Sequence, residues 1–298
     1  MLAGKVAVFG VPTAAGARGP GPERAPFALR EAGLLDALRG GGAVVVNLSD
    51  LSLFPHRDDP DHPHARNAPV VACAARAAED EMTRALAEGF TLILGGDCTL
   101  VAGTLAGARR RLEQPVGLVF LDAEADLNTP ETTPSGCLNG MALALALGLG
   151  PPELVGGSAP AVAPEHVSLV GFRALDPGEK GRLGDLGLAL PAGAARKLGM
   201  RTTASLALDG VENGDGPILV HLDVDLLDPS DMAAKDPLTP GPGLTWSEAS
   251  DLLTALLASP RVVALQIAEF NPSLDAGGAA AQRLVALIAR AVLRHLRA

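Results

Sequence analysis

The sequence predicts an α/β protein of three layers, α/β/α, with a central and mostly parallel sheet. Short apolar segments rich in β-branched residues alternate along the chain with longer segments of helical composition, which is typical of strand–helix–strand units. The apolar segments are continuously hydrophobic, as expected for strands that helices cover on both faces. No linker-like stretch divides the chain, so we expect one domain over residues 1–298.

Each predicted strand is followed by turn or polar residues. The segments predicted as strands are residues 6–11, 43–48, 91–94, 117–121, 167–170, 218–224 and 262–267. The segments predicted as helices are residues 25–38, 70–88, 100–111, 245–258 and 278–297. Loops rich in glycine, proline and polar residues are expected at 155–164 and 209–217.

The composition excludes several classes of protein. The chain has 34 acidic and 24 basic residues, so its formal charge is −10, and it lacks the basic excess of a nucleic-acid-binding protein. No apolar run reaches the length of about 18 residues that a membrane-spanning helix needs, so neither nucleic acid nor membrane is expected as a partner. Three cysteines do not make a disulfide framework, and a cytoplasmic, reducing location is expected.

Three features away from the strand ends are interpreted as structural. His56, His62 and His64 lie in a polar segment that could bind metal, but we expect a solvated loop. Cys73 is predicted in the core face of its helix, and Trp246 is predicted to open a helix. We expect no disulfide between the other two cysteines.

Polar motifs follow three of the predicted strands, and a fourth motif lies at the end of the predicted strand 218–224. They are GGDC at 95–98, DAEAD at 122–126, HLDVD at 221–225 and AEFNP at 268–272. In an open parallel sheet, ligands bind outside the carboxyl ends of the strands. Because the period of a strand is two, Asp122, Glu124 and Asp126 should share one face if the chain stays extended there. His221, Asp223 and Asp225 should share one face of their own strand.

The acids of these motifs are predicted to converge and to need a counter-charge. Buried carboxylates that repel one another are stabilised by cations or protons, and a pair of divalent metal ions is the simplest solution. Carboxylates suit hard or borderline ions such as Mg²⁺ and Mn²⁺. The alternative is that the acids are separate helix caps and turn residues.

These motifs resemble those of the ureohydrolase family, which contains the arginases and agmatinases. The family carries four motifs in a fixed order and spacing: GGDHS, DAHxD, DxDxxDP and ExNP. The corresponding motifs of this chain are GGDCT, DAEAD, DVDLLDP and EFNP. The segments 8–35, 126–141 and 171–179 are also similar to arginase segments, so the resemblance covers nearly the whole chain. It implies an arginase-like α/β/α fold, a small-molecule guanidino substrate, and a homo-oligomer, trimer or hexamer.

The resemblance also implies two divalent metal ions, most commonly Mn²⁺. The first ion would be held by Cys98, Asp122, Asp126 and Asp223. The second would be held by Asp122, Glu124, Asp223 and Asp225. Cys98 and Glu124 stand where the family has histidine ligands; both are competent metal ligands, which indicates a retuned site rather than a lost one.

Further roles follow from the resemblance for the substrate and the reaction. Residues matched to substrate contacts are Asn128 and Ser135 at the carboxylate, Cys137 in place of an arginase Asn, Asp176 and Glu179 at the α-amino group, and Glu269 at the guanidinium. Asp126 would orient the attacking water, and Asn139 stands where arginase has a proton-shuttling histidine. His221 could replace that shuttle, support a ligand, or be a packed core histidine. The segment 232–237 departs from the arginase pattern.

Two functions from different classes are therefore open. The first is a dinuclear-metal amidinohydrolase that converts arginine or N-hydroxyarginine to ornithine and urea or hydroxyurea. Its Cys, Glu and Asn substitutions are similar to those of the N-hydroxyarginine-hydrolysing ureohydrolase of D-cycloserine biosynthesis. The alternative is a catalytically inactive relative that acts as a binding or regulatory subunit. A weaker third option is another amide or guanidine hydrolase of the same superfamily.

Overall fold

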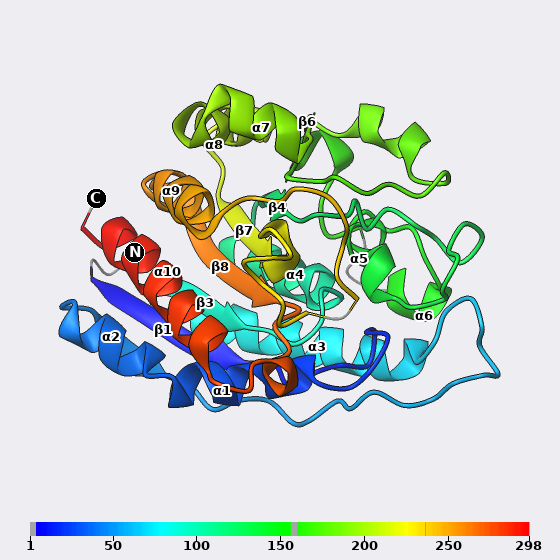
Figure 1. Ribbon diagram of the computed structural model, residues 1–298, viewed down its shortest axis with the longest axis horizontal. Helices are drawn as coiled ribbons and strands as arrows, with labels where there is room; N and C mark the ends of the chain where they lie inside the picture. Colours follow the sequence, from blue (N-terminus) through cyan, green and yellow to red (C-terminus); the bar gives the residue numbers. More distant parts are fainter. Residues whose placement is uncertain (1–3, 156–159, 236, 298) are drawn as a thin grey trace.

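A single parallel sheet forms the centre of the computed structural model, which describes residues 4–155, 160–235 and 237–297 (Figure 1). Its eight strands follow the order β2-β1-β3-β8-β7-β4-β5-β6, and every neighbouring pair is parallel. Their bounds are β1 Lys5–Gly10, β2 Val44–Asn47, β3 Phe90–Leu94, β4 Gly117–Leu121, β5 Val167–Val170, β6 Leu188–Leu190, β7 Ile218–Asp223 and β8 Val262–Ala268.

Helices cover both faces of this sheet (Figure 1). Helices α1, α2, α8, α9 and α10 contribute to the hydrophobic core on one face, and α3, α4 and α5 to the core on the other. The bounds are α1 Ala25–Glu31, α2 Leu34–Gly40, α3 Ala68–Ala85, α4 Leu100–Leu112, α5 Ala142–Ala146, α6 Pro152–Val155, α7 Ala192–Leu198, α8 Met200–Asp209, α9 Trp246–Leu257 and α10 Ala279–His295. The three-layer α/β/α prediction is confirmed.

The strand β1 shows why continuous apolar runs predict this architecture. Val6 and Val8 point into the core beneath α10, whereas Ala7 and Phe9 point into the core beneath α3. Both faces of the strand are buried, so a polar side chain on either face would lose its contact with water.

The predicted strands and helices are all present, with ends shifted by a few residues. The segment 25–38 is not one helix, because Gly33 adopts a left-handed conformation (φ 89°) and separates α1 from α2. The short strand β6 and the helices α5 to α8 were not predicted. The predicted loop at 155–164 includes residues 156–159, which lie outside the described residues.

Three structural interpretations have different outcomes. Trp246 opens α9 as predicted and donates its indole N–H to the Asp231 carbonyl at 3.1 Å. His62 is exposed and pairs with Asp59 at 2.9 Å, as expected for a solvated loop. The prediction for Cys73 was wrong, because this residue lies on the exposed side of α3.

The strand order brings the four predicted motifs together. Strands β3, β8, β7 and β4 are consecutive neighbours at the middle of the sheet. Because they are parallel, their carboxyl ends lie at one edge, and the polar residues that follow them meet there. Within the described part of the chain, no helix has the length and apolar character needed to cross a membrane.

Candidate active site

The turn after β3 directs Cys98 into the interior. A side chain at Gly96 would meet the Thr13 carbonyl at 1.8 Å, so only glycine fits there. The buried Asp97 carboxylate accepts hydrogen bonds from the Gly16 amide at 3.0 Å and the Thr99 amide at 3.1 Å. These bonds tie the turn to a neighbouring loop and leave Cys98 only 1% exposed at the start of α4.

Cys98 contacts two residues of strand β7, which β8 separates from β3 in the sheet. Its sulfur lies 3.2 Å from Nε2 of His221 and donates to Oδ2 of Asp223 at 3.2 Å. The strand period correctly predicted that His221 and Asp223 share one side. His221 is fully buried, stacks on Phe120 with ring centroids 4.4 Å apart, and has Gln266 Nε2 3.0 Å from its Nδ1.

The acidic residues meet by turns rather than by extended strands. Strand β4 ends at Leu121 and β7 ends at Asp223, while Asp225 lies in a 3-10 turn whose amide donates to Asp223 Oδ1 at 2.7 Å. The chain therefore does not stay extended through residues 122–126, and Asp225 lies beyond the end of the strand that carries His221 and Asp223. Asp126 has a left-handed φ of 52°, which is uncommon for a residue with a side chain.

Asp122 and Asp225 differ in how their oxygens are satisfied. Asp122 Oδ1 accepts from the Glu124 amide at 2.7 Å, but its Oδ2 is buried and has no hydrogen-bond partner among the described residues. Asp225 Oδ1 accepts from the Ala123 amide at 3.1 Å, and its Oδ2 accepts from Lys235 Nζ at 2.7 Å. An unpaired buried carboxylate oxygen is costly, so the open side of Asp122 is the place where a cation fits.

Lys235 brings a positive charge into the acidic cluster. Its side chain is buried, and its Nζ also lies 3.6 Å from Asp223 Oδ2. Burial alone would lower the pKa of Lys235, but the charges of Asp223 and Asp225 hold it well above its usual range. Burial alone would likewise raise the pKa of Asp225, but Lys235 and the Thr239 hydroxyl bring it down to about 2.

The pKa values of the other buried groups in the cluster are also shifted by burial. Burial, reinforced by neighbouring carboxylates, raises the pKa of Asp122, Asp126 and Asp223. Burial and the same negative field raise the pKa of the Cys98 thiol, and burial lowers the pKa of His221 to about 3. A group of this kind is stabilised in its charged, ligating form when a divalent cation binds it.

Glu269 lies at the end of β8 beside Cys98 and Asn139. Its Oε1 accepts from the Cys98 amide at 3.1 Å and from Asn139 Nδ2 at 3.4 Å. Burial raises the pKa of Glu269 to about 7. Like Asp126, Glu269 has a left-handed backbone, with a φ of 64°, and strain of this kind is concentrated at functional sites.

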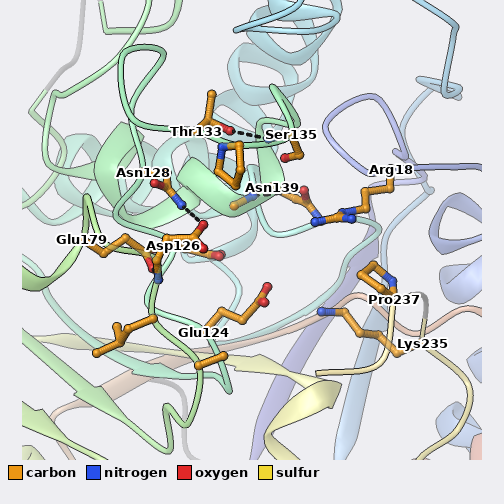
Figure 2. A pocket seen from close by; sticks show the side chains of 15 residues that line it. Arg18, Glu124, Asp126, Asn128, Thr133, Ser135, Asn139, Glu179, Lys235 and Pro237 are labelled. Carbon is orange, nitrogen blue, oxygen red and sulfur yellow. Dashed lines mark hydrogen bonds between the residues drawn. The ribbon is translucent and has the colours of Figure 1, made fainter. Parts of the chain in front are cut away.

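A polar pocket adjoins the cluster and shares Lys235 with it (Figure 2). Its lining includes seven of the predicted site residues: Glu124, Asp126, Asn128, Ser135, Asn139, Asp176 and Glu179. Arg18 and Lys235 also line it, and Figure 2 shows the Lys235 ammonium and the Glu124 carboxylate pointing toward one another. Lys235 therefore connects the pocket to the buried cluster.

Two predicted substrate residues have other contacts. Both oxygens of Glu179 accept from backbone amides, those of Leu127 at 2.9 Å and Asp176 at 2.7 Å, so Glu179 holds these two segments together. Cys137 is buried and is not among the residues that line the pocket. Asn128 donates to Asp176 at 2.8 Å, which links the two predicted ends of the amino-acid site.

The described residues contain three groups with a geometry suited to a metal ion. They are Cys98, Asp122 and His221; Cys98, Asp223 and Glu269; and Asp122, Asp223 and Asp225, each with ligand atoms within 4.8 Å of one another. Glu124 and Asp126, which were predicted as ligands, belong to none of these groups.

A parallel α/β fold with a cluster of buried acids, a thiol and an imidazole beside a polar pocket is the arrangement of a metal-dependent hydrolase. The arginase family model matches residues 4–294, and the chain belongs to this family. It is 33% identical to the arginase of Bacillus caldovelox, over 95% of this chain and 96% of that protein.

Solved arginase structures have the same fold. The arginase of Bacillus cereus superposes with a TM-score of 0.85 at 30% identity, covering 96% of this chain and 97% of that one. The Entamoeba histolytica arginase, solved in complex with L-ornithine, gives a TM-score of 0.85 at 25% identity, covering 98% and 99% of the two chains. The protein is a ureohydrolase, a hydrolase that acts on C–N bonds of linear amidines in small guanidino compounds.

Enzymes of this family use two metal ions, typically Mn²⁺. The open oxygen of Asp122 and the donors around it fit one divalent ion in this chain. A second ion at Asp225 does not fit the structure as it stands, because protein donors already occupy both oxygens of that carboxylate.

Sequence reasoning missed Arg18, Lys235 and Gln266. Lys235 is one of only four lysines in the chain and follows the last aspartate motif closely, which is a usable signal. Arg18 lies in a Gly/Pro-rich loop that runs back over the pocket. Gln266 is a polar residue at the middle of an apolar strand, where a buried amide needs a partner.

Proposed function

We propose that this protein hydrolyses the guanidino group of an arginine-like amino acid, either arginine or N-hydroxyarginine, to ornithine and urea or hydroxyurea. The observation that carries the proposal is a polar pocket lined by groups that suit an amino acid, two of which contact the buried acidic cluster. Lys235 pairs with Asp225, and Asn139 donates to Glu269.

The outer part of the pocket suits the amino-acid end of the substrate. Asn128 and Ser135 offer an amide and a hydroxyl, and Arg18 adds a positive charge; these groups suit a carboxylate. The Asp176 carboxylate lies beside Asn128 and suits the α-ammonium. We assign Glu179 to positioning, because its oxygens bind the backbone on either side of this site.

The inner part suits the guanidino end. Glu269 can pair with a guanidinium through the oxygen that is not bound to Cys98. The Asp126 carboxylate lines the pocket, and we assign it to orienting the attacking water and accepting its proton, because a positioned carboxylate can act as a general base.

The buried cluster is proposed to hold the metal. Cys98, Asp122 and Asp223 would hold a divalent ion, with Mn²⁺ as the family default. Such an ion would supply Lewis acidity that activates water at neutral pH. Binding would displace the Cys98 proton that now faces Asp223.

Asn139 favours N-hydroxyarginine over arginine. An amide at this position, 3.4 Å from Glu269, cannot deliver a proton to a leaving amine as an imidazole can. An N-hydroxyguanidine is less basic than a guanidinium, so it enters the site in its neutral form more easily and needs less help from a shuttle. The Entamoeba histolytica arginase binds L-ornithine, which is the proposed product here.

The alternative of an inactive regulatory relative has no specific support in this arrangement. Cys98 and Glu124, which stand where the resemblance implies histidines, have side-chain atoms that can bind a metal ion. Cys98 belongs to two of the three groups suited to a metal ion. The single-domain organisation, the cytoplasmic location and the trimer or hexamer stay predictions.

A substrate panel tests the proposal. The protein is loaded with Mn²⁺ and incubated with arginine, N-hydroxyarginine, agmatine and guanidinobutyrate, and ornithine, urea and hydroxyurea are quantified. We expect turnover of an amino-acid substrate and little of the two compounds that lack an α-amino acid group. Equal turnover of arginine and N-hydroxyarginine would contradict the preference that we draw from Asn139.

A further inference from the structure

The acidic cluster has one open side and one side that a lysine fills. Asp122 Oδ2 is buried and has no partner in the part of the chain that the structure describes, whereas Asp225 accepts from Lys235, from the Thr239 hydroxyl at 2.8 Å and from a backbone amide. A cation is needed at the first position, and a cation is already present at the second.

The position of Lys235 is determined by the loop that carries it. The Ala234 carbonyl, just before Lys235, accepts from the Asn271 amide at 2.8 Å. Further along the same loop, the Thr239 carbonyl accepts from Arg173 at 3.2 Å. The loop is thus bound to the protein on both sides of Lys235, and the ammonium has two carboxylates within 3.6 Å.

His221 has the position and the support of a metal ligand. Its Nε2 faces Cys98 Sγ at 3.2 Å, and it forms a group with Cys98 and Asp122 that is suited to an ion. The Gln266 amide contacts its Nδ1, and Thr104 contacts the other end of that amide at 2.7 Å. If the Gln266 side-chain amide is turned by 180°, Nδ1–H of His221 can donate to the Gln266 carbonyl oxygen. In that tautomer Nε2 of His221 carries no hydrogen, and its lone pair is directed toward the cluster.

We propose that this site binds a single divalent ion through Cys98, His221, Asp122 and Asp223, and that the Lys235 ammonium takes the place and part of the charge of the second ion. The proposal rests on the metal dependence in the proposed function but not on its substrate. A thiolate, an imidazole and two carboxylates suit a borderline ion such as Zn²⁺ or Co²⁺ better than an all-oxygen site does.

A second ion is disfavoured by charge as well as by ligands. It would lie against the Lys235 ammonium inside a buried cluster, where water screens like charges poorly. It would also have to break the 2.7 Å contact between Lys235 and Asp225. Removal of the lysine side chain should therefore open this position.

Metal content tests the proposal without an activity assay. The purified protein is saturated with Mn²⁺, freed of loose metal by gel filtration, and measured for metal per chain. We expect one ion in the wild type and in the control Lys197→Ala, which changes an exposed lysine of α7. We expect two ions in Lys235→Ala and Lys235→Met, with circular dichroism confirming that each variant is folded.

Spectroscopy of the wild type makes the test independent of the variants. Its Mn²⁺ signal in electron paramagnetic resonance should be that of an isolated ion rather than of a coupled pair. The Co²⁺ form should show a thiolate charge-transfer band that Cys98→Ser loses, and His221→Asn should alter the ligand-field bands. Two ions in the wild type, or one ion in a folded Lys235→Met, would overturn the proposal. One bound ion with no turnover of any guanidino compound would instead count against the proposed function.

Discussion

The sulfur of Cys98 lies 3.2 Å from Nε2 of His221, although the two residues are 123 positions apart in the chain. Cys98 stands where the resemblance to the family implies a histidine, and this contact places an imidazole from strand β7 beside that position. The contact depends on the parallel pairing of β8 between β3 and β7, which brings the ends of these strands to one edge.

The three cysteines should differ sharply in reactivity. Cys73 is exposed, whereas Cys98 and Cys137 are buried, and burial raises the pKa of the Cys98 thiol. Because the thiolate is the reactive form, a thiol reagent should label one cysteine rapidly in the native protein and all three after unfolding. Rapid native labelling of Cys98, located by peptide mass spectrometry, would contradict the buried cluster.

Arg18→Ala should weaken binding of amino-acid substrates. A charge-assisted hydrogen bond contributes about 1.5–3 kcal/mol, and Arg18 is exposed at the pocket mouth, so we expect about a tenfold rise in KM with little change in kcat. Steady-state kinetics measure both constants. Arg24→Ala is the matched control, since Arg24 is exposed and does not line the pocket; an equal effect of the two variants would count against the carboxylate role.

Arg173→Met should destabilise the fold. Arg173 Nη2 donates to the carbonyls of Asp225, Leu227 and Thr239, and removal of its charge would leave buried acceptors unpaired. We expect a loss of about 2–3 kcal/mol in the free energy of unfolding, measured by chemical denaturation. Arg201→Met, at an exposed position of α8, should stay close to the wild type. Similar stability of the two variants would show that these three bonds are dispensable.

His295 should make stability depend on pH. Burial lowers its pKa below the ordinary 6.5, and it packs on Phe90 with ring centroids 4.4 Å apart. The unfolded chain therefore binds a proton more readily than the native state, so this contribution is present above pH 6.5 and is lost as pH falls through the native pKa. One proton changes the free energy of unfolding by at most about 1.4 kcal/mol per pH unit.

The variant His295→Gln checks that origin. Its free energy of unfolding should fall less than that of the wild type between pH 7.5 and pH 5.5, as followed by denaturant titration at each pH. Parallel pH dependence of the two proteins would assign the effect to other groups.

Asn139→His should increase the hydrolysis of arginine. A positioned acid–base group contributes about 10²–10⁴-fold to a reaction rate, and the new imidazole would lie beside Glu269. We expect at least about a tenfold rise in kcat for arginine and a smaller change for N-hydroxyarginine. An equal gain for both substrates would remove the argument that Asn139 selects between them.

Much of the fold was predictable because its signals are local. The buried strands are continuous apolar runs, and Thr245 with Glu248 forms the capping box that starts α9. Elements such as β6 and α7 have little hydrophobic pattern of their own, since β6 is only partly buried and α7 buries just two alanines. Their structure depends on tertiary contacts, so the local sequence pattern does not predict them.

The site was predictable in its composition but not in its charge balance. Motif spacing placed Cys98, Asp122 and Asp223 together, because strand ends determine where they lie. Lys235 reaches the cluster from a loop that has no periodic pattern, and its partner Asp225 is ten positions away. Only the folded chain shows that this loop turns back and delivers its ammonium to the acids.

The most direct test of the central claim is hydrolysis in ¹⁸O-labelled water. The metal-loaded protein is given N-hydroxyarginine or arginine, and the products are analysed by mass spectrometry beside Asp126→Asn as the control. We predict equimolar ornithine and singly labelled hydroxyurea or urea from the wild type, with at least about a 100-fold slower release from the variant. No labelled product from either substrate, in protein shown to be folded and to contain metal, would contradict the proposed function and favour the inactive relative.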